Sequence, residues 1–401
     1  MTANRPSSFT YGPGVRMGSG VADDLAGLLP DGPVLFITDA NVRALGLAGG
    51  ALSSFCSPAK AGVQPFVAAE AGPRPSPGNV IVFDAVEADP SRETLEAAVA
   101  VGREAGFASV VGFGGGSPMD VAKLAAYLLG SGDDLDAIWG VGRATGKRLP
   151  LVLVPTTAGT GSEATPVSII TDGHEKKGVS SPALVADVAL LDAALTLGLP
   201  RGVTAATGID AMVHAIEAFT SARLKNPLSD MLAREALRLL GANIRTACDE
   251  PSNIEARAAM LLGAHLAGVA FANAPVGGVH ALAYPLGSRF GVAHGLSNAL
   301  MLPHVLGHNL HAALPLYAEL GMLLDPALAS QGEQGRARGL VDAMDAIAAD
   351  AGVPRTLRQV GVTAADLDAL AADAMRQERL LVNNPCEIGE GDARRIYEAA
   401  F

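Results

Sequence analysis

Short apolar runs alternate with Ala- and Leu-rich helical segments over residues 33–191, and this alternation limits the fold more than any other feature of the chain. The runs read VLFIT at 34–38, VIVFD at 80–84, SVVGFG at 109–114 and LVLVP at 151–155. Continuous apolar runs of this length are typical of strands buried on both faces, and helices between them connect parallel strands. We therefore expect an α/β region with a doubly wound, mostly parallel sheet.

The strand signal almost disappears after residue 200, and Ala- and Leu-rich segments with helical spacing continue to residue 401. A chain of 401 residues also favours two domains over one core. We predict an α/β domain over 1–198 and an all-helical domain over 199–401, with a cleft between them. The Pro-, Ala- and Gly-rich segment 56–79 is expected to be a surface connection.

Charge and composition exclude several classes of partner. The formal net charge is -12 and the pI is about 5.1, so the surface would repel nucleic acid and anionic membranes. The most apolar stretch, 258–272, is shorter than the roughly 20 residues that span a bilayer, and we predict a buried helix there. The three cysteines are far apart and the N-terminus lacks a secretory signal pattern, which favours a cytoplasmic protein with a small diffusible ligand.

A glycine triplet, Gly114, Gly115 and Gly116, follows the third apolar run and precedes a helix that is expected to begin near Ser117 and Pro118. Glycines let backbone approach a pyrophosphate closely, and a helix N-terminus offers unpaired N–H groups to it. Ser117 is a candidate N-cap and phosphate donor. A glycine triplet is also compatible with a plain tight turn, and the motif is not the GxGxxG fingerprint.

Two further segments follow apolar runs. The loop VPTTAGTGSEAT at 154–165 is rich in hydroxyl groups, which are often only local caps of backbone. Asp39 ends the first run, where a carboxylate can bind the ribose hydroxyls of NAD and repel the 2′-phosphate of NADP. The alternative for Asp39 is a helix N-cap.

One carboxylate and three histidines in the helical half form a candidate metal site. Asp210 and His214 lie four residues apart on a helical pattern and so share one face. His280 and His294 lie in an apolar, Gly-bounded stretch, where a single histidine is more often a core residue than a ligand. Together, the four side chains suit a divalent ion of intermediate softness, such as Fe(II) or Zn.

The string GGGSPMDVAK at 114–123 resembles the GGGSxxDxAK signature of the iron-containing alcohol dehydrogenase family, and PTTAGTGSE at 155–163 resembles a second family string. The resemblance implies a dehydroquinate synthase-like architecture, NAD as cofactor, Fe(II) or Zn as metal, and a homodimer or larger homo-oligomer. It implies Asp210, His214, His280 and His294 as metal ligands, and leaves His265, His304, His308 and His311 as structural residues. It implies these cofactor-binding residues: Asp39, Gly114, Gly115, Gly116, Ser117, Asp120, Thr156, Thr157, Thr160, Ser162 and Lys176, with Lys177 as the alternative to Lys176.

The chain departs from the family pattern at two positions. Tyr284 stands where many relatives have a further histidine, one helical turn after His280, and Asp89 precedes Pro90 where many relatives have Asn. A phenol can relay a proton but is a poorer base near neutral pH, so Tyr284 is a candidate catalytic residue whose role differs from that of the family histidine. Asp120, near the nicotinamide ribose in relatives, is the second candidate.

The resemblance implies an NAD-linked, metal-dependent alcohol dehydrogenase or aldehyde reductase, in which the metal lowers the alcohol pKa while hydride passes to nicotinamide. Its substrate would be a small alcohol, aldehyde or hydroxyacid, and Arg289 is a candidate for attracting a substrate carboxylate. A hydroxyacid-oxoacid transhydrogenase is the alternative, followed by a metal-dependent cyclase or lyase. A metal-free maleylacetate reductase is disfavoured by the four ligands. A hydrolase based on Ser162 lacks the GxSxG elbow, and a non-catalytic NAD sensor stays open.

Overall fold

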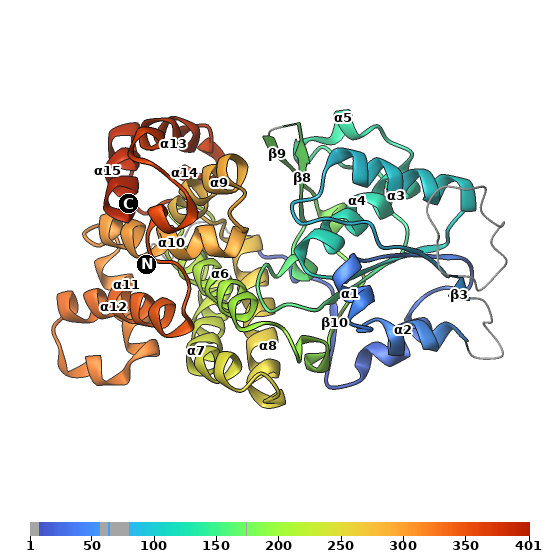
Figure 1. The fold of residues 1–401 in the computed structure, drawn as a ribbon, viewed down its shortest axis with the longest axis horizontal. Coiled ribbons are helices and arrows are strands. Elements are labelled where there is room, and N and C mark those ends of the chain that lie inside the picture. Colours follow the sequence, from blue (N-terminus) through green and yellow to red (C-terminus); the bar gives the residue numbers. More distant parts are fainter. Residues whose placement is uncertain (1–7, 57–62, 65–79, 174) are drawn as a thin grey trace. The chain divides into compact units, whose positions relative to one another are not determined.

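A computed structural model of the chain describes residues 8–56, 63–64, 80–173 and 175–401. Most of the segment predicted as a surface connection, 56–79, lies outside these residues. The chain divides into two compact units (Figure 1). The α/β unit comprises residues 12–157 and 162–196, and the helical unit comprises residues 1–11, 158–161 and 197–401. The division into two domains at residues 198 and 199 stays a prediction.

The α/β unit is built around a parallel sheet of seven strands in the order β1-β10-β7-β5-β2-β4-β3. The four predicted apolar runs form β2 (Val34–Ile37), β4 (Val80–Phe83), β5 (Ser109–Gly114) and β7 (Leu151–Pro155). The remaining strands of this sheet are β1 (Gly14–Met17), β3 (Val63–Gln64) and β10 (Val188–Leu191). A smaller sheet contains β6 (Gly140–Val141), β8 (Val167–Asp172) and β9 (Glu175–Ser180). The prediction of a parallel sheet is therefore confirmed.

Both faces of the large sheet are buried along β2, β4, β5 and β7, as the unbroken apolar runs predicted. Along β2, Val34 and Phe36 belong to one hydrophobic cluster, whereas Leu35 and Ile37 belong to another. This division follows from the period of two in a strand, which sends successive side chains to opposite faces. The longest helices of the unit, α3 (Arg92–Ala105) and α4 (Gly116–Ser131), contribute to the second cluster. The shorter ones, α1 (Ala40–Ala44) and α2 (Gly49–Ser53), contribute to the first.

The direction of chain winding reverses between β2 and β5. After β2 the chain places β3 and β4 on one side, and then β5, β7 and β10 follow on the other side. The loops that leave the carboxyl ends of β2 and β5 therefore depart in opposite directions along the sheet. Such a switch point is where open α/β sheets bind ligands. Asp39 and the glycine triplet both lie at this point of the sheet.

The remaining helical segments of the α/β unit are short. They are α5 (Leu135–Ile138) and the 3-10 helices η1 (Val21–Leu28), η2 (Ser54–Cys56), η3 (Ser162–Ala164), η4 (Pro182–Leu184) and η5 (Ala193–Thr196).

The helical unit has no strand among its described residues, in agreement with the sequence prediction. Its long helices are α6 (Arg201–Thr220), α7 (Pro227–Asp249), α8 (Ile254–Asn273), α9 (Gly278–Phe290), α10 (His294–Asn309), α11 (Leu314–Leu324) and α12 (Glu333–Ala351). The others are η6 (Pro326–Ser330), η7 (Leu357–Val360), η8 (Ala364–Asp366), α13 (Leu367–Met375), α14 (Glu378–Leu381) and α15 (Glu390–Ala400).

Two helices of this unit are largely buried. Residues 208–220 of α6 are all buried, and α8 contains the apolar stretch predicted as a buried helix. Of the described helices, α8 alone has the length and composition to cross a bilayer, but 61% of its most apolar window is buried inside the protein. Because α6, α7 and α8 pack against one another, α8 is a core helix of this unit.

Candidate functional site

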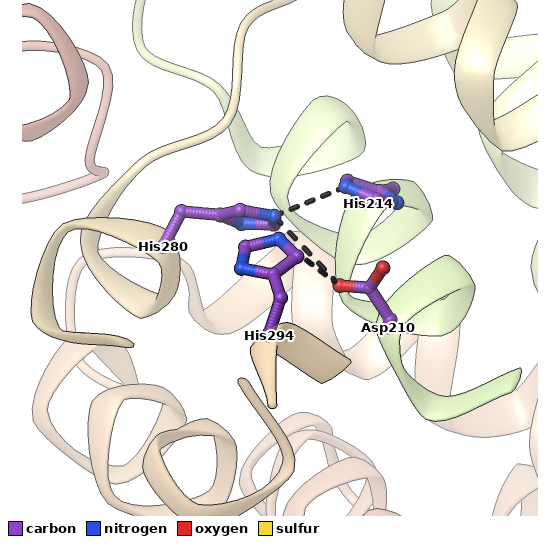
Figure 2. A group of neighbouring side chains, drawn as sticks. All are labelled: Asp210, His214, His280 and His294. Carbon is purple, nitrogen blue, oxygen red and sulfur yellow. Dashed lines mark hydrogen bonds and ion pairs between the residues drawn. The ribbon is translucent and has the colours of Figure 1, made fainter. Parts of the chain in front are cut away.

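Four side chains from three helices of the helical unit come together in one cluster (Figure 2). Asp210 and His214 come from the middle of α6, His280 from the first turn of α9, and His294 from the first residue of α10. One ligand atom of each lies within 4.8 Å of the others. His280 Nε2 lies 3.0 Å from His214 Nε2 and 4.0 Å from Asp210 Oδ1, and His294 Nε2 lies 3.7 Å from the same carboxylate oxygen. The structure thus brings together all four residues of the predicted metal set.

Burial and mutual proximity control the protonation of this cluster. Burial, together with the nearby His280 and His294 imidazoles, lowers the pKa of His214 to about 3 despite the adjacent carboxylate. Burial alone would raise the pKa of Asp210, but the histidines and the Asn298 amide outweigh it, so that pKa lies below its usual value. Near neutral pH the cluster therefore contains an ionised carboxylate and a neutral His214, the forms in which both bind metal ions.

Two buried residues that contact the cluster were missed in the sequence. Glu217, one turn beyond His214 on α6, places Oε2 2.6 Å from His280 Nδ1. Asn298, one turn after His294 on α10, donates from Nδ2 to Asp210 Oδ1 at 2.6 Å. Its Nδ2 also lies 3.2 Å from His280 Nε2 and 3.3 Å from His294 Nε2. Helical spacing from the predicted ligands, three and four residues, was the available signal for both.

Tyr284 lies beside the cluster, and Arg289 makes a surface ion pair. The centroid of the Tyr284 ring lies 5.7 Å from that of the His294 ring. The Arg379 guanidinium also contacts Tyr284, at 6.0 Å from its ring centroid. Among the described residues, no partner hydrogen-bonds to the Tyr284 hydroxyl. Arg289 pairs with Asp373 and is exposed, which is the ordinary role of a surface arginine. The other histidines among the described residues, His265, His304, His308 and His311, are not members of the cluster.

In the α/β unit, the glycine triplet forms the turn between β5 and α4. Gly114 has φ of 151°, and a Cβ there would lie 2.8 Å from Pro118 Cγ, so this position requires glycine. The N-cap of α4 is Gly115 and the helix begins at Gly116. The expectation that Ser117 is the N-cap is therefore wrong. Gly115, whose backbone is extended, caps the helix two residues before the predicted position. Ser117 therefore lies inside the first turn, and its N–H is one of the donors without a partner in the helix.

The hydroxyl-rich loop follows β7 at the same edge of the sheet. Thr156 N–H donates to Gly114 O at 2.9 Å, and Gly115 lies next to Thr157, whose Oγ1 would be 3.5 Å from a Cβ there. Ser162 belongs to the α/β unit as well, whereas Thr160 lies in the short segment 158–161 that belongs to the helical unit. Strand pairing of β5 with β7 thus accounts for the proximity of the two loops.

Asp120, in the first turns of α4, anchors a buried polar network. Its Oδ1 accepts from Ser162 Oγ at 2.5 Å, and its Oδ2 accepts from Ile169 N–H at 2.8 Å. Lys123 is fully buried and donates to Ser162 Oγ at 2.7 Å, to Val167 O at 2.7 Å and to Thr165 Oγ1 at 3.2 Å. Burial raises the pKa of Asp120 and lowers the pKa of Lys123, and each opposes the shift of the other. This pair ties α4 to β8.

Asp39 and Lys176 both have structural partners. Asp39 is the N-cap of α1, since its Oδ1 accepts from Asn41 N–H and Val42 N–H at 2.9 Å. Its Oδ2 faces Gly114, so capping leaves one carboxylate oxygen directed toward the glycine loop. Lys176 donates to Asp89 Oδ1 at 2.7 Å, which brings a predicted cofactor residue against one of the two departures from the family pattern. Lys177 pairs with Asp172 instead.

Comparison with known proteins agrees with these features. The family model described as iron-containing alcohol dehydrogenase matches residues 13–193, and the model of the C-terminal part of that family matches residues 204–401. The chain is 43% identical over 326 residues to long-chain-alcohol dehydrogenase 1 of Geobacillus thermodenitrificans, a match that covers 80% of this chain and 82% of the relative.

Solved structures show the same fold. The crystal structure of a 1,3-propanediol oxidoreductase has a TM-score of 0.90 and 31% identity, covering 99% of this chain and all of that one. Sulfoacetaldehyde reductase from Bifidobacterium kashiwanohense, solved in complex with NAD+, has a TM-score of 0.82 and 26% identity, with 99% of both chains covered. The chain therefore belongs to the iron-containing alcohol dehydrogenase family and is an NAD-linked, metal-using oxidoreductase of alcohols and aldehydes.

Proposed function

We propose that Asp210, His214, His280 and His294 hold the divalent metal of this dehydrogenase. The convergence of their four ligand atoms within 4.8 Å carries the proposal. The donor set fits a cation on chemical grounds. The ring nitrogens of His214 and His280 face each other at 3.0 Å, and a neutral His214 has a lone pair available for a ligand bond. One carboxylate and three imidazoles suit Fe(II) and Zn, with Fe(II) preferred on the family resemblance.

The loops of the α/β unit are proposed to bind NAD. The first N–H groups of α4, including that of Ser117, have no partner within the helix and favour a pyrophosphate. Gly114 to Gly116 would let the phosphates approach the backbone. The hydroxyls of Thr156, Thr157 and Thr160 would supply donors to the cofactor, and Ser162, whose O–H donates to Asp120, would contact it as an acceptor. Asp39 Oδ2 would accept from the adenine ribose, Asp120 would orient Ser162 near the nicotinamide ribose, and Lys176 would contact the cofactor ribose.

With both groups bound, the metal supplies a Lewis acid that polarises the C–O bond and NAD supplies the hydride acceptor or donor. The protein orients the ligands for this chemistry. Asn298 holds Asp210 by its amide, and the buried walls of α6 and α8 exclude water from His214. We propose that the Tyr284 hydroxyl donates or accepts the proton that leaves the substrate oxygen, because it lies on the His294 side of the cluster.

The substrate is proposed to be a small alcohol, aldehyde or hydroxyacid. Relatives named for 1,3-propanediol and for sulfoacetaldehyde support a small substrate, whereas the relative named for long-chain alcohols supports a longer one. We also propose a cytoplasmic location and a homodimer or larger homo-oligomer, in keeping with the acidic composition of the chain.

A substrate panel tests this function directly. Metal-reconstituted protein is assayed with NAD+ on short and long primary alcohols, diols and hydroxyacids, and with NADH on the matching aldehydes. We expect reduction of a short aldehyde with the highest kcat/KM, and none of this activity after chelation. Oxidoreduction that proceeds only when a hydroxyacid and an oxoacid are supplied together, with the cofactor retained through turnover, would identify a transhydrogenase instead.

The role of Tyr284 is tested by Tyr284→Phe, which removes a single oxygen. If the hydroxyl transfers a proton, turnover should fall about 100-fold, the scale of positioned acid–base catalysis. Metal content and NAD affinity should stay unchanged. Unaltered turnover over a range of pH would show that the ring only fills space.

A further inference from the structure

Both carboxylate oxygens of Glu217 form hydrogen bonds with residues of α9, the helix that carries His280. It lies on α6 seven residues after Asp210 and three after His214, so these three side chains share one face of the helix. Its Oε2 is 2.6 Å from His280 Nδ1, and its Oε1 accepts from Val279 N–H at 2.7 Å. The side chain is only 7% exposed. A single buried carboxylate therefore connects α6 to two consecutive residues of α9.

The contact with His280 decides which ring nitrogen carries the proton. The Asn298 amide nitrogen lies 3.2 Å from His280 Nε2 and can only donate, so Nε2 is the accepting nitrogen, and Nδ1, 2.6 Å from Glu217 Oε2, carries the proton. The lone pair then belongs to Nε2, the atom that lies 3.0 Å from His214 Nε2 and faces the cluster. A neutral imidazole with this tautomer is the form that binds a metal ion through Nε2. Glu217 thus presents His280 in its metal-binding form.

The contact with Val279 fixes where His280 lies. Helix α9 begins at Gly278 after Gly277, which has no side chain to cap it. Its first two N–H groups are instead accepted by Asn384 Oδ1, at 3.2 Å from Gly278 N, and by Glu217 Oε1. A carboxylate at a helix N-terminus also interacts favourably with the helix dipole. The same side chain therefore holds both the backbone and the ring of the first turn of α9.

We propose that Glu217 is a positioning residue that sets the metal affinity of the site by fixing the tautomer and position of His280. The inference rests on the proposed metal site. It adds a function for a residue that is not itself among the four ligands. Carboxylates behind a metal-binding histidine change metal affinity by about 10- to 100-fold when they are removed.

Glu217→Gln is the most direct variant because it keeps the shape of the side chain. A glutamine has one acceptor oxygen and one NH2 group, so it cannot accept from both Val279 N–H and His280 Nδ1–H. With its oxygen on Val279, its NH2 faces Nδ1 and favours the opposite tautomer, whose Nε2–H points a proton at the ligands. We expect Zn2+ to dissociate about 10- to 100-fold more readily, as measured by competition with a chromophoric chelator.

A second readout does not depend on metal or on activity. In metal-free protein with 15N-labelled histidine, the His280 proton should lie on Nδ1 in the wild type and move to Nε2 in Glu217→Gln. Glu217→Asp keeps both acceptor oxygens on a shorter arm, and its Zn2+ affinity should lie between those of the wild type and the Gln variant. NAD titration, which reports on the α/β unit, should be the same for all three proteins and so shows that each variant is folded.

Asn384→Ala provides the matched control. It removes the other acceptor at the N-terminus of α9 and makes no hydrogen bond to His280, so it should lower thermal stability while leaving Zn2+ affinity near that of the wild type. If Glu217→Gln behaves like this control, with unchanged Zn2+ affinity and an unchanged Nδ1 proton, Glu217 only caps α9 and the inference is wrong. Wild-type protein that fails to bind Zn2+ would instead overturn the metal site on which the inference rests.

Discussion

The two compact units assemble their candidate sites in different ways. In the α/β unit, most residues proposed for NAD follow the carboxyl ends of β2, β5 and β7, Lys176 lies on β9, and much of the binding is assigned to backbone N–H groups. In the helical unit, the proposed ligands come from α6, α9 and α10, and all the binding is assigned to side chains. The first site therefore depends on a turn encoded locally, whereas the second depends on how three helices pack.

This difference has a consequence for mutations. A site that binds its ligand through backbone N–H groups tolerates side-chain substitutions that leave the turn intact, such as a substitution at a helix N-cap. A side-chain site fails when any ligand or its supporting partner is removed. Mutations should therefore separate the units, since a change in one site should leave the ligand of the other site bound.

The largest effect is expected for His280→Ala, which leaves three protein ligands. Metal catalysis contributes several kcal/mol, so kcat/KM should fall at least about 100-fold, at 1.36 kcal/mol for each tenfold. Metal content after gel filtration should fall as well, while NAD titration stays at the wild-type value. His311→Ala, an exposed histidine outside the cluster, is the control. Full metal content in His280→Ala would remove His280 from the ligand set.

Asp120→Ala tests the α/β unit. It leaves Lys123 buried without its carboxylate partner, and breaking a buried pair in this way costs about 3–5 kcal/mol. Denaturant unfolding should show this loss and NAD affinity should fall, but metal content should not. The double variant with Lys123→Met should regain part of the stability, because the buried ammonium that lost Asp120 is itself removed. A double variant less stable than Asp120→Ala would contradict the explanation.

Asp39→Ser sharpens the distinction between capping and cofactor selection. Serine keeps the N-cap of α1, so stability should change little. Removing a charge that faces the 2′-phosphate removes a repulsion of about 1 kcal/mol, so the ratio of NADP to NAD use should rise about fivefold. The measurement is kcat/KM for each cofactor. An unchanged ratio would leave Asp39 with only its capping role.

The smallest effect is expected for Asp187→Asn, a residue outside both sets of proposed site residues. Asp187 accepts from Arg148 at 2.7 and 2.9 Å and from Leu151 N–H at 2.8 Å, but it is half exposed, so the loss should be about 0.5–1 kcal/mol. Although burial opposes it, hydrogen bonding to Arg148 and Leu151 lowers the pKa of Asp187.

The sign of the pH dependence follows from that shift. A carboxyl whose pKa is lower in the folded state stabilises the fold above its unfolded pKa, and this contribution is lost as pH falls through the folded pKa. The difference in unfolding free energy between wild type and Asp187→Asn should thus be full near pH 7 and decline as the pH falls below the unfolded pKa of about 3.9 and through the lower folded pKa. A difference that persists at low pH would assign it to packing.

Much of the fold could be predicted from residue patterns. The strands β2, β4, β5 and β7 were located within one residue, because doubly buried strands have continuous apolar runs that stand out from helices. Strand β1 was not predicted, since its four residues, GVRM, are exposed and lack any apolar pattern. Strand β1 lies at the sheet edge because it pairs with β10, a strand that comes near the end of the α/β unit in the sequence.

How well the site residues could be predicted depends on how far apart they lie in the sequence. The turn at Gly114 and the pair Asp210 and His214 are local, so spacing and glycine geometry were enough to single them out. The start of α4 was predicted too late in the sequence, because its N-cap, Gly115, has no side chain by which a cap could be recognised. Glu217 and Asn298 carried only helical spacing, which does not tell a structural carboxylate from one that faces a histidine.

The sequence by itself therefore determined the class of each element, the glycine turn and the types of side chain available to NAD and to a metal, since these depend on local conformational preference and chemistry. Only the tertiary structure decided that His280 presents Nε2 to the cluster and that Asn298 reaches Asp210. It also decided that Asp89 takes Lys176 as its partner. These contacts join residues far apart in the chain, and their geometry is set by helix packing and strand pairing, which local sequence does not specify.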